Sequence, residues 1–245
     1  MNEFILPNGI TIDGVLYNRA HLEELTGKQQ NYLVNTKYKS PVDHIERLLG
    51  DLLVDVRDSN QNSILNHVTK QHLVMKMLQI EDISFLLIKL REISFGEKYF
   101  FEKVECSHCK AKNTARLNLA SLEIIKPENA PIPEGGHVLP RAGLKIEYKP
   151  LNLSELASYG SDSERLLNNH ITEACVSLLS KLGNESVTAQ TVESLKAKDT
   201  QYIIDNAPKY NYLDNKLTHQ CTSCKRDFDF ELGELSADFF APSRT

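Results

Sequence analysis

The strongest pattern of apolar and polar positions lies in residues 81–96, which read EDISFLLIKLREISFG. Its apolar positions recur at helical spacing and share one face, formed by Ile83, Leu86, Leu87 and Leu90. Glu81 and Asp82 stand where the positive end of a helix favours acidic residues. Lys89 and Arg91 stand nearer the other end, and Gly96 can supply a left-handed stop. We therefore expect a helix that leads directly into the first cysteine-containing segment.

Shorter sequence patterns before residue 81 predict one hairpin and two further helices. The stretch LPNGI places an Asn-Gly turn between apolar residues and predicts a small hairpin. Thr26 and Gln29 have capping-box spacing at the start of one helix. Ser40 as N-cap and Pro41 at the first helical position predict another helix over residues 40–56. The N-terminal region is thus expected to be mostly helical.

The second half of the chain has a mixed pattern. A Pro/Gly-rich connector (126–136) precedes a predicted hairpin (137–151). A long helix is expected from Ser161 to about Gly183, with an apolar stripe formed by Leu167, Ile171, Ala174, Cys175, Leu178 and Leu182. Two shorter helices are predicted in VTAQTVESLKAK and DTQYIIDNA, the second closed by Pro208. This region is expected to form a small α+β module.

Composition narrows the class of protein. The 245 residues are 41% hydrophobic and carry a net charge of −5, which suits a soluble globular protein with a sizeable core. The longest apolar stretch, ISFLLIKL, is far shorter than the roughly 20 residues of a membrane span. The start MNEFILPNG lacks the pattern of a signal peptide, so we expect synthesis and residence in the cytosol. A pI near 5.9 argues against a general nucleic-acid binder.

The candidate chemistry lies in two matching cysteine pairs. Cys106 and Cys109 occur in VECSHCKAKNTARLNL, and Cys221 and Cys224 repeat the spacing in HQCTSCKRDFDFEL. Each pair follows a short strand pattern, is followed directly by lysine, and continues into an alternating strand. The alternation puts Ala115, Leu117 and Leu119 on one face after the first pair, and Phe228, Phe230 and Leu232 after the second. The repeat indicates a duplicated knuckle.

Four cysteines in two such turns suit a closed tetrahedral metal site. Each Cys-x-x-Cys turn can present two sulfurs to one ion, and four thiolates are the set that structural zinc favours. We therefore predict a structural Zn²⁺ held by Cys106, Cys109, Cys221 and Cys224. A redox pair and unliganded thiols remain alternatives, although a redox pair is expected at the start of a helix. His108 and His219 beside the cysteines are alternative ligands, but we interpret them as exposed turn or strand residues, because four sulfurs already satisfy the metal.

Other reactive side chains have ordinary structural interpretations. Cys175 lies on the apolar helical stripe and is expected to be small core filling without nucleophilic chemistry. Asp51 with Asp55, and Glu81 with Asp82, are interpreted as solvated helix faces or helix starts. We find no GxSxG, Walker loop, dinucleotide fingerprint or HExxH motif, and thus no catalytic or cofactor-binding residues beyond the metal ligands. The sequence predicts a protein that is not an enzyme.

The order of these elements resembles a known family. The hairpin and LTGKQQNYL helix, the helix ending in LREISFGEKYFFEKVECSHC, the helical insertion and the returning Cys-x-x-Cys are similar to baseplate proteins of T-even-like tailed bacteriophages, the family associated with the central baseplate hub. Residues 85–125 carry the most specific part of the resemblance, and residues 184–215 carry little. Lys110 and Lys225 depart from zinc ribbons in general, which often have glycine after the cysteine pair.

The resemblance implies a structural or assembly protein of the virion. Its partners would be other phage tail and baseplate proteins, with no small-molecule substrate, membrane or nucleic acid. It would be made in the host cytoplasm and built into the tail baseplate. The predicted organisation is α+β: a mostly helical region (1–97), a split zinc ribbon (98–125 and 213–235) and an inserted module (126–212).

Two other classes of function remain open from the sequence. The first is a zinc-ribbon nucleic-acid-binding regulatory protein, because zinc ribbons often have that role. It predicts a clustered basic face, whereas the lysines and arginines around the knuckles alternate with acidic residues. The second is a hydrolase, which would need an open metal position that four cysteines do not leave.

Overall fold

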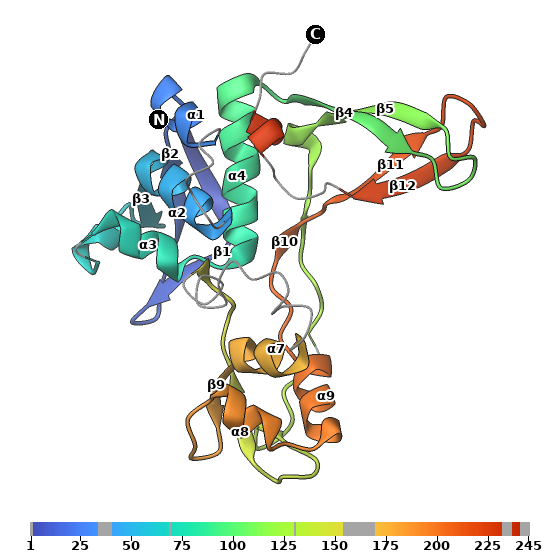
Figure 1. Cartoon of the computed structure of the whole chain (residues 1–245). Coiled ribbons are helices and arrows are strands. Elements are labelled where there is room, and N and C mark those ends of the chain that lie inside the picture. The colour runs from blue at the N-terminus through green and yellow to red at the C-terminus, as the bar shows by residue number, and fades with distance from the viewer. Residues whose placement is uncertain are drawn as a thin grey trace.

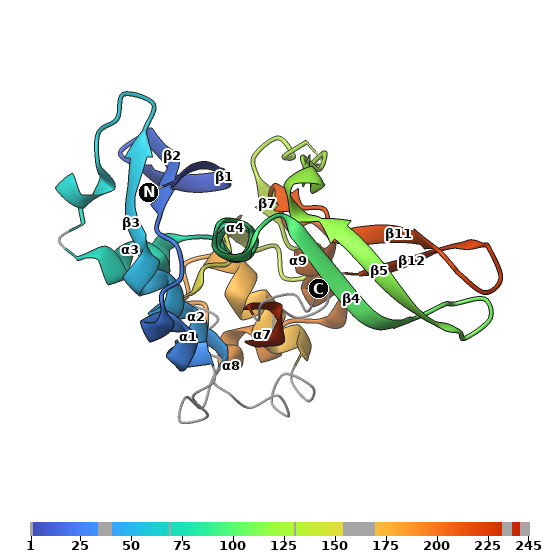
Figure 2. The same cartoon turned by 90° about the horizontal axis from the view of Figure 1, so that it is seen from above.

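The computed structural model describes residues 2–33, 41–68, 70–129, 131–153, 170–231 and 237–240 of the chain. These residues form three regions around the long helix α4 (Ile80–Phe95) (Figure 1). An N-terminal lobe packs beside α4, an arm of two β-ribbons extends from the C-terminal end of α4, and a small module lies beyond the N-terminal end (Figures 1 and 2). Helices and small antiparallel sheets are mixed along the chain, which confirms the predicted α+β class.

The N-terminal lobe is built on an antiparallel sheet with the order β1-β2-β3, formed by β1 (Asn2–Ile12), β2 (Val15–Leu22) and β3 (Leu53–Asp58). β1 and β2 turn at Asp13 and Gly14, whose φ angles are 49° and 78°. The prediction that Asn8 and Gly9 form the turn is wrong, because they lie at a bulge inside β1. Asn-Gly and Asp-Gly both suit a tight turn, and pairing with β2 on both sides of the bulge selects the second.

Short helices cover this sheet. They are α1 (Gly27–Leu33), α2 (Pro41–Leu52), the 3₁₀ turn η1 (Ile64–Asn66) and α3 (Gln71–Met77). The capping prediction for α1 is supported, because the Gln29 side chain accepts a hydrogen bond of 3.2 Å from the N–H of Thr26. α2 begins at Pro41 as predicted, whereas Ser40 lies outside the described residues. The sequence pattern did not predict α3.

The predicted extension of α2 to residue 56 is wrong. The chain leaves the helix at Leu52 because residues 53–58 pair with β2 as β3. Asp55 is therefore buried in a strand, not solvated on a helix face. Its carboxylate accepts hydrogen bonds from Arg57 Nε (2.8 Å) and Ser63 Oγ (2.7 Å), which offset the cost of burial.

Helix α4 is surrounded on most sides. Its predicted apolar face is confirmed, and it is buried together with Phe85 and Ile88. Gly96 ends the helix with a φ of 86°, and its N–H donates to the carbonyl of Glu92. Asp82 lies in the first turn of the helix as predicted, but its side chain is fully buried and not solvated. Arg91 is fully buried as well, so both charges have structural partners rather than solvent.

The arm consists of two antiparallel ribbons, one of β4 (Lys98–Glu105) with β5 (Lys112–Asn118), the other of β11 (Lys216–Gln220) with β12 (Asp227–Glu231). The predicted alternation is confirmed at Ala115, Leu117 and Phe228, which are buried. Leu119 is buried in the 3₁₀ turn η2 (Leu119–Ser121), and Leu232 lies outside the described residues. The rings of Phe101 and Phe230 meet edge to face at 5.3 Å and join the ribbons.

The inserted module contains the predicted hairpin and helices. Its sheet has the order β7-β8-β9, with β7 (His137–Val138), β8 (Lys145–Tyr148) and β9 (Leu179–Leu182), and its helices are α7 (His170–Leu178), α8 (Ala189–Glu193) and α9 (Ala197–Asp205). The long helix was predicted to reach Gly183, but it ends at Leu178 because residues 179–182 pair with β8. Its predicted start at Ser161 lies outside the described residues. The module has its own buried cluster, which includes Ile146, Cys175 and Ile203.

The module is joined to the N-terminal lobe and α4 near the N-terminal end of that helix. The short strands β6 (Ile124–Ile125) and β10 (Tyr212–Leu213) pair where the chain enters and leaves the module. The N–H groups of Asn8 and Gly9 donate to the carboxylate of Asp82 at 2.8 and 2.9 Å. The side chain of Asn8 in turn exchanges two hydrogen bonds with the backbone of Asn211 (2.8 and 2.9 Å). A partly buried network of hydrogen bonds thus links β1, α4 and the returning chain.

Candidate metal centre

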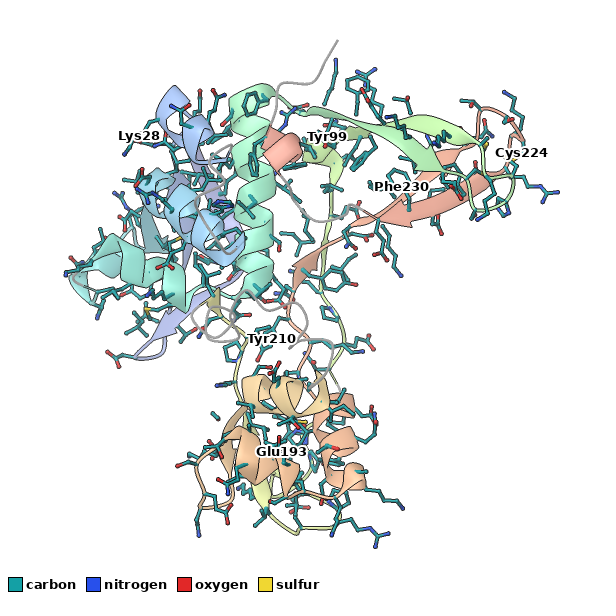
Figure 3. All side chains as sticks on the ribbon, viewed as in Figure 1. Lys28, Tyr99, Glu193, Tyr210, Cys224 and Phe230 are labelled. Carbon is teal, nitrogen blue, oxygen red and sulfur yellow. The ribbon has the colours of Figure 1, made fainter. Side chains whose placement is uncertain are left out.

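The two cysteine pairs meet at the far end of the arm. Figure 3 places Cys224 there, remote from α4. Cys106 Sγ lies 3.8 Å from Cys224 Sγ, and Cys109 Sγ lies 3.6 Å from Cys221 Sγ. The four sulfur atoms all lie within 4.8 Å of one another, which is close enough for one metal ion to contact all four. The structure therefore brings together every cysteine that the sequence singled out for metal binding.

The two knuckles have the same backbone shape. In the first, the N–H of Cys106 donates to the carbonyl of Ala111 (3.0 Å), and the N–H of Lys110 donates to the carbonyl of Cys106 (2.9 Å). The second knuckle repeats both hydrogen bonds at the matching positions, at 2.9 and 3.0 Å. Lys110 and Lys225 have φ angles of 62° and 61°, a region that favours glycine. The turn of a zinc knuckle is thus retained although lysine occupies the position where glycine is common.

Buried residues of the two ribbons pack against the cysteines of both knuckles. Cys106 and Cys221 are fully buried, and Phe228 is buried with them in the same apolar cluster. Cys224 is half-buried and Cys109 is exposed. The sulfurs therefore stand at the edge of a small apolar cluster, where an ion could be reached by the cysteines and shielded by the ribbons.

The histidines beside the cysteines have other positions. His108 is exposed, and its Nε2 lies 3.0 Å from the carbonyl oxygen of Asp227 in the second knuckle. His219 lies on β11 and contacts the ring of Phe228 edge to face at 5.8 Å. Among the residues that the structure describes, no group of three or more His, Cys, Asp or Glu side chains other than the four cysteines could hold a metal ion.

The pKa values of Cys221 and Cys109 are shifted in opposite directions. The backbone N–H groups of Cys224 and Ser223, together with neighbouring thiols, lower the pKa of Cys221 to about 6. The N–H of Ala111 acts in the same direction on Cys109, but the loss of water around its sulfur and the three neighbouring thiols outweigh it and raise the pKa of Cys109 to about 11. The opposite directions of the two pKa shifts reflect the cost of ionising neighbouring thiols together. A bound cation is what would allow four adjacent thiolates.

Sequence reasoning missed Asn113, which lies beside the cysteines on β5. Its side chain is buried, and its amide contacts Cys221 and Thr222 in the second knuckle. The sequence held one signal for this role. Asn113 lies between Ala111 and Ala115 on the inward face of β5, where the strand pattern expects an apolar residue.

A comparison with protein families identifies the chain. The family model described as T4 bacteriophage base plate protein matches residues 21–241. The chain belongs to this baseplate family. The match begins at the end of β2 and spans the rest of the N-terminal lobe, both knuckles and the inserted module, so it includes all four cysteines of the cluster. No curated protein and no solved structure matches the chain.

Membership in the baseplate family gives the chain a structural role in the phage baseplate, at the tail of the virion and among other tail proteins. This confirms the family resemblance that the sequence suggested. In the described part of the chain, no helix is long and apolar enough to cross a membrane.

Cys175, the cysteine outside the knuckles, is fully buried, and its Sγ lies 3.7 Å from the carbonyl of Thr200.

Proposed function

We propose that this baseplate protein binds one structural zinc ion through Cys106, Cys109, Cys221 and Cys224. Four sulfurs about 2.3 Å from a tetrahedral zinc ion are about 3.8 Å from one another. The cross-knuckle Sγ–Sγ distances of 3.8 and 3.6 Å fit that geometry. An all-sulfur donor set favours zinc over calcium, magnesium or manganese, which prefer oxygen ligands.

The proposed ion stabilises structure and takes no part in catalysis. Four protein ligands fill a tetrahedral zinc ion and leave no position for an activated water. Knuckle backbones of matching shape hold all four sulfurs at the tip of a ribbon arm. We infer that the protein has no enzymatic activity and no small-molecule substrate.

The same ion would close a long loop. Cys106 and Cys221 are 115 positions apart, since 221 − 106 = 115, and the inserted module lies between them. Loop-closure entropy grows only with the logarithm of loop length, whereas zinc binding to such sites contributes on the order of 10 kcal/mol. Metal binding can therefore hold the two ribbons together against the entropy of the intervening chain.

We further propose that the protein works by docking other tail and baseplate proteins. α4 has 16 residues, and at 1.5 Å per residue it is about 24 Å long. The module adjoins its N-terminal end, where the N–H of Ile80 donates to the carbonyl of Leu151, and the metal arm begins just after its C-terminal end, at Lys98 (Figure 1). A rigid element that holds two appendages in a fixed relation lowers the entropy lost on assembly. In this proposal the predicted division into residues 1–97, 98–125 with 213–235, and 126–212 corresponds to body, arm and module.

The charge distribution on the arm favours protein partners over nucleic acid. Four exposed basic residues of the arm, Lys110, Lys112, Lys225 and Arg226, are matched by four exposed acidic residues, Glu105, Asp227, Asp229 and Glu231. Glu105 also forms an ion pair with Lys110, at 3.4 Å. Phosphate-backbone binding depends on an unopposed surplus of Lys and Arg. We therefore propose protein contacts, made in the host cytoplasm during assembly and kept in the baseplate.

The observation that carries the proposal is the convergence of four cysteines in a chain of the baseplate family. The test uses the encoding phage with Cys106→Ser and Cys224→Ser together, and separately with the gene deleted. Both changes should abolish complete, infectious tails, whereas Cys175→Ala, which removes the cysteine outside the cluster, should preserve them. Fully tailed infectious particles from the deletion phage would overturn the structural role.

A further inference from the structure

The two knuckles have the same backbone shape, but they differ in their polar side chains. Asn113 and His108 of the first knuckle contact groups of the second. Asn113 follows Cys109 by four positions on β5 and is only 4% exposed. The residue four positions after Cys224 is Phe228, a buried apolar side chain that makes no equivalent contact. The second contact between the knuckles runs in the same direction, from the His108 ring to the backbone of Asp227. First-knuckle side chains thus hold second-knuckle groups.

The amide of Asn113 makes every hydrogen bond available to it. Its Nδ2 donates to the carbonyl of Ala111 (2.9 Å) and to Cys221 Sγ (3.7 Å). Its Oδ1 accepts from the backbone N–H of Thr222 (2.9 Å) and from Thr222 Oγ1 (3.0 Å). An asparagine side chain offers two donor and two acceptor positions, so the group is fully satisfied. Because a backbone N–H can only donate, the contact with Thr222 also fixes which amide atom is oxygen.

We infer that Asn113 is a positioning residue that docks the second knuckle onto the first and orients Cys221 for the metal. This inference rests on the proposed zinc site. Three of the four hydrogen bonds of the amide cross a sequence separation of more than 100 residues to Cys221 and Thr222. The bond to Ala111 anchors the same amide in its own knuckle. The amide therefore sets the distance between the two halves of the site without contacting the ion.

The two functions of the amide can be separated chemically. Its oxygen holds the backbone of the second knuckle through Thr222, and its N–H group donates to the sulfur of Cys221. An N–H···S bond stabilises a thiolate, and groups that hydrogen-bond to metal ligands typically change metal affinity by 10- to 100-fold. Asn113→Ala removes both functions. Asn113→Asp keeps the acceptors for Thr222 but removes the donor to Cys221.

Zinc affinity is the first readout, measured on the full chain by competition with a chromophoric chelator. Asn113→Ala should weaken zinc binding by about 10- to 100-fold. Asn118→Ala is the matched control, because Asn118 lies on the same strand and its side chain accepts a hydrogen bond from the N–H of Ala120 in its own turn, away from the cysteines. It should change the affinity less than twofold. Equal affinity of Asn113→Ala and the parent would overturn the inference.

Amide hydrogen exchange is the second readout, and it distinguishes positioning from a general loss of structure. In zinc-loaded Asn113→Ala, the N–H of Thr222 should exchange much faster, whereas the N–H of Lys225, which bonds to Cys221 within its own knuckle, should keep its protection. In Asn113→Asp, Thr222 should stay protected while zinc affinity still falls. Equal acceleration at Thr222 and Lys225 would show a structural effect only and contradict the inference.

The measurements also separate this inference from the zinc proposal. If the parent protein binds no zinc under reducing conditions, the proposed metal function fails. The exchange of the Thr222 N–H in the metal-free protein then still shows whether Asn113 docks the second knuckle. If Asn113→Ala does not fold, the Asn113→Asp comparison decides: retained protection of Thr222 with weakened zinc binding supports the inference, and unchanged zinc binding overturns it.

Discussion

Asp82 and Arg91 lie nine positions apart on α4, and both charged side chains are completely buried. Asp82 accepts hydrogen bonds from the backbone of Asn8 and Gly9, and Arg91 Nε donates to the carbonyl of Phe239 at 2.9 Å. Each charge thus fastens a segment that is distant in sequence to one end of the helix. These contacts hold β1 at the N-terminal end of the helix and the segment around Phe239 at its C-terminal end.

We predict a pH dependence of stability that depends on Asp82. Burial, with a contribution from the nearby Glu81 charge, raises the pKa of Asp82 from 3.8 to about 6, against the opposing effect of the N–H groups of Asn8 and Gly9. The folded state therefore binds this proton more tightly than the unfolded state. Its contribution to stability is complete below about pH 4 and is lost as the pH rises through 6, a change of about 3 kcal/mol.

Asp82→Asn provides the comparison for this prediction, because it cannot titrate. Urea unfolding of both proteins from pH 4 to pH 7 should show that the parent loses about 3 kcal/mol relative to the variant over this range. Parallel pH profiles for the two proteins would show that the Asp82 proton is not linked to folding.

Arg91 is predicted to secure the C-terminal 3₁₀ turn η3 (Ala237–Phe240) against α4. Its guanidinium also lies 4.8 Å from the ring of Phe95 and 5.7 Å from that of Tyr99. Arg91→Met should leave the carbonyl of Phe239 without its donor and cost about 2–3 kcal/mol in unfolding free energy. Arg116→Met, at an exposed arginine over Phe100, should cost less than about 1 kcal/mol. Equal costs for the two changes would contradict the role of Arg91.

Gly9 and Gly14 test the bulge in β1. Their φ angles of 72° and 78° are similarly unfavourable for alanine. A Cβ on Gly9 would lie 2.6 Å from the carbonyl oxygen of Tyr17, whereas a Cβ on Gly14 would meet nothing within 4 Å. Gly9→Ala should therefore cost about 1–3 kcal/mol more than Gly14→Ala in chemical denaturation. A difference near zero would mean that the bulge relaxes freely around the added methyl group.

Cys175 is predicted to be unreactive in the folded protein. Burial raises the pKa of its thiol to about 11, so at pH 8 only about one thiol in a thousand is ionised. Alkylation of the native, zinc-loaded protein should leave Cys175 unmodified until denaturant is added, as peptide mapping would show. Rapid labelling of Cys175 under native conditions would mean that the module opens easily.

Local patterns identified the parts of the fold whose residues interact with near neighbours. The face of α4 and its stop at Gly96 follow from helical periodicity and from the backbone freedom of glycine. The knuckles follow from cysteine spacing, because a Cys-x-x-Cys turn is a local structure. The sequence also predicted all four cysteines of the cluster, since the repeated spacing reveals the second half of the site.

Long-range pairing determined what local patterns could not predict. Residues 53–58 and 179–182 have helical periodicity with the preceding residues, but they become strands because β2 and β8 offer them partners. The burial of Asp82 depends on the bulge at Asn8, 74 positions earlier. Asn113 likewise has its role only when the second knuckle is beside it. None of these contacts leaves a periodic signal in one sequence.

Zinc content of the purified protein tests the central claim most directly. Native mass spectrometry under reducing conditions should show one zinc ion per chain in the parent, because all four sulfurs can contact a single ion. Cys106→Ser with Cys224→Ser should show none, and Cys175→Ala should retain the ion. A parent chain without zinc, whose four knuckle cysteines react freely with an alkylating reagent, would contradict the account.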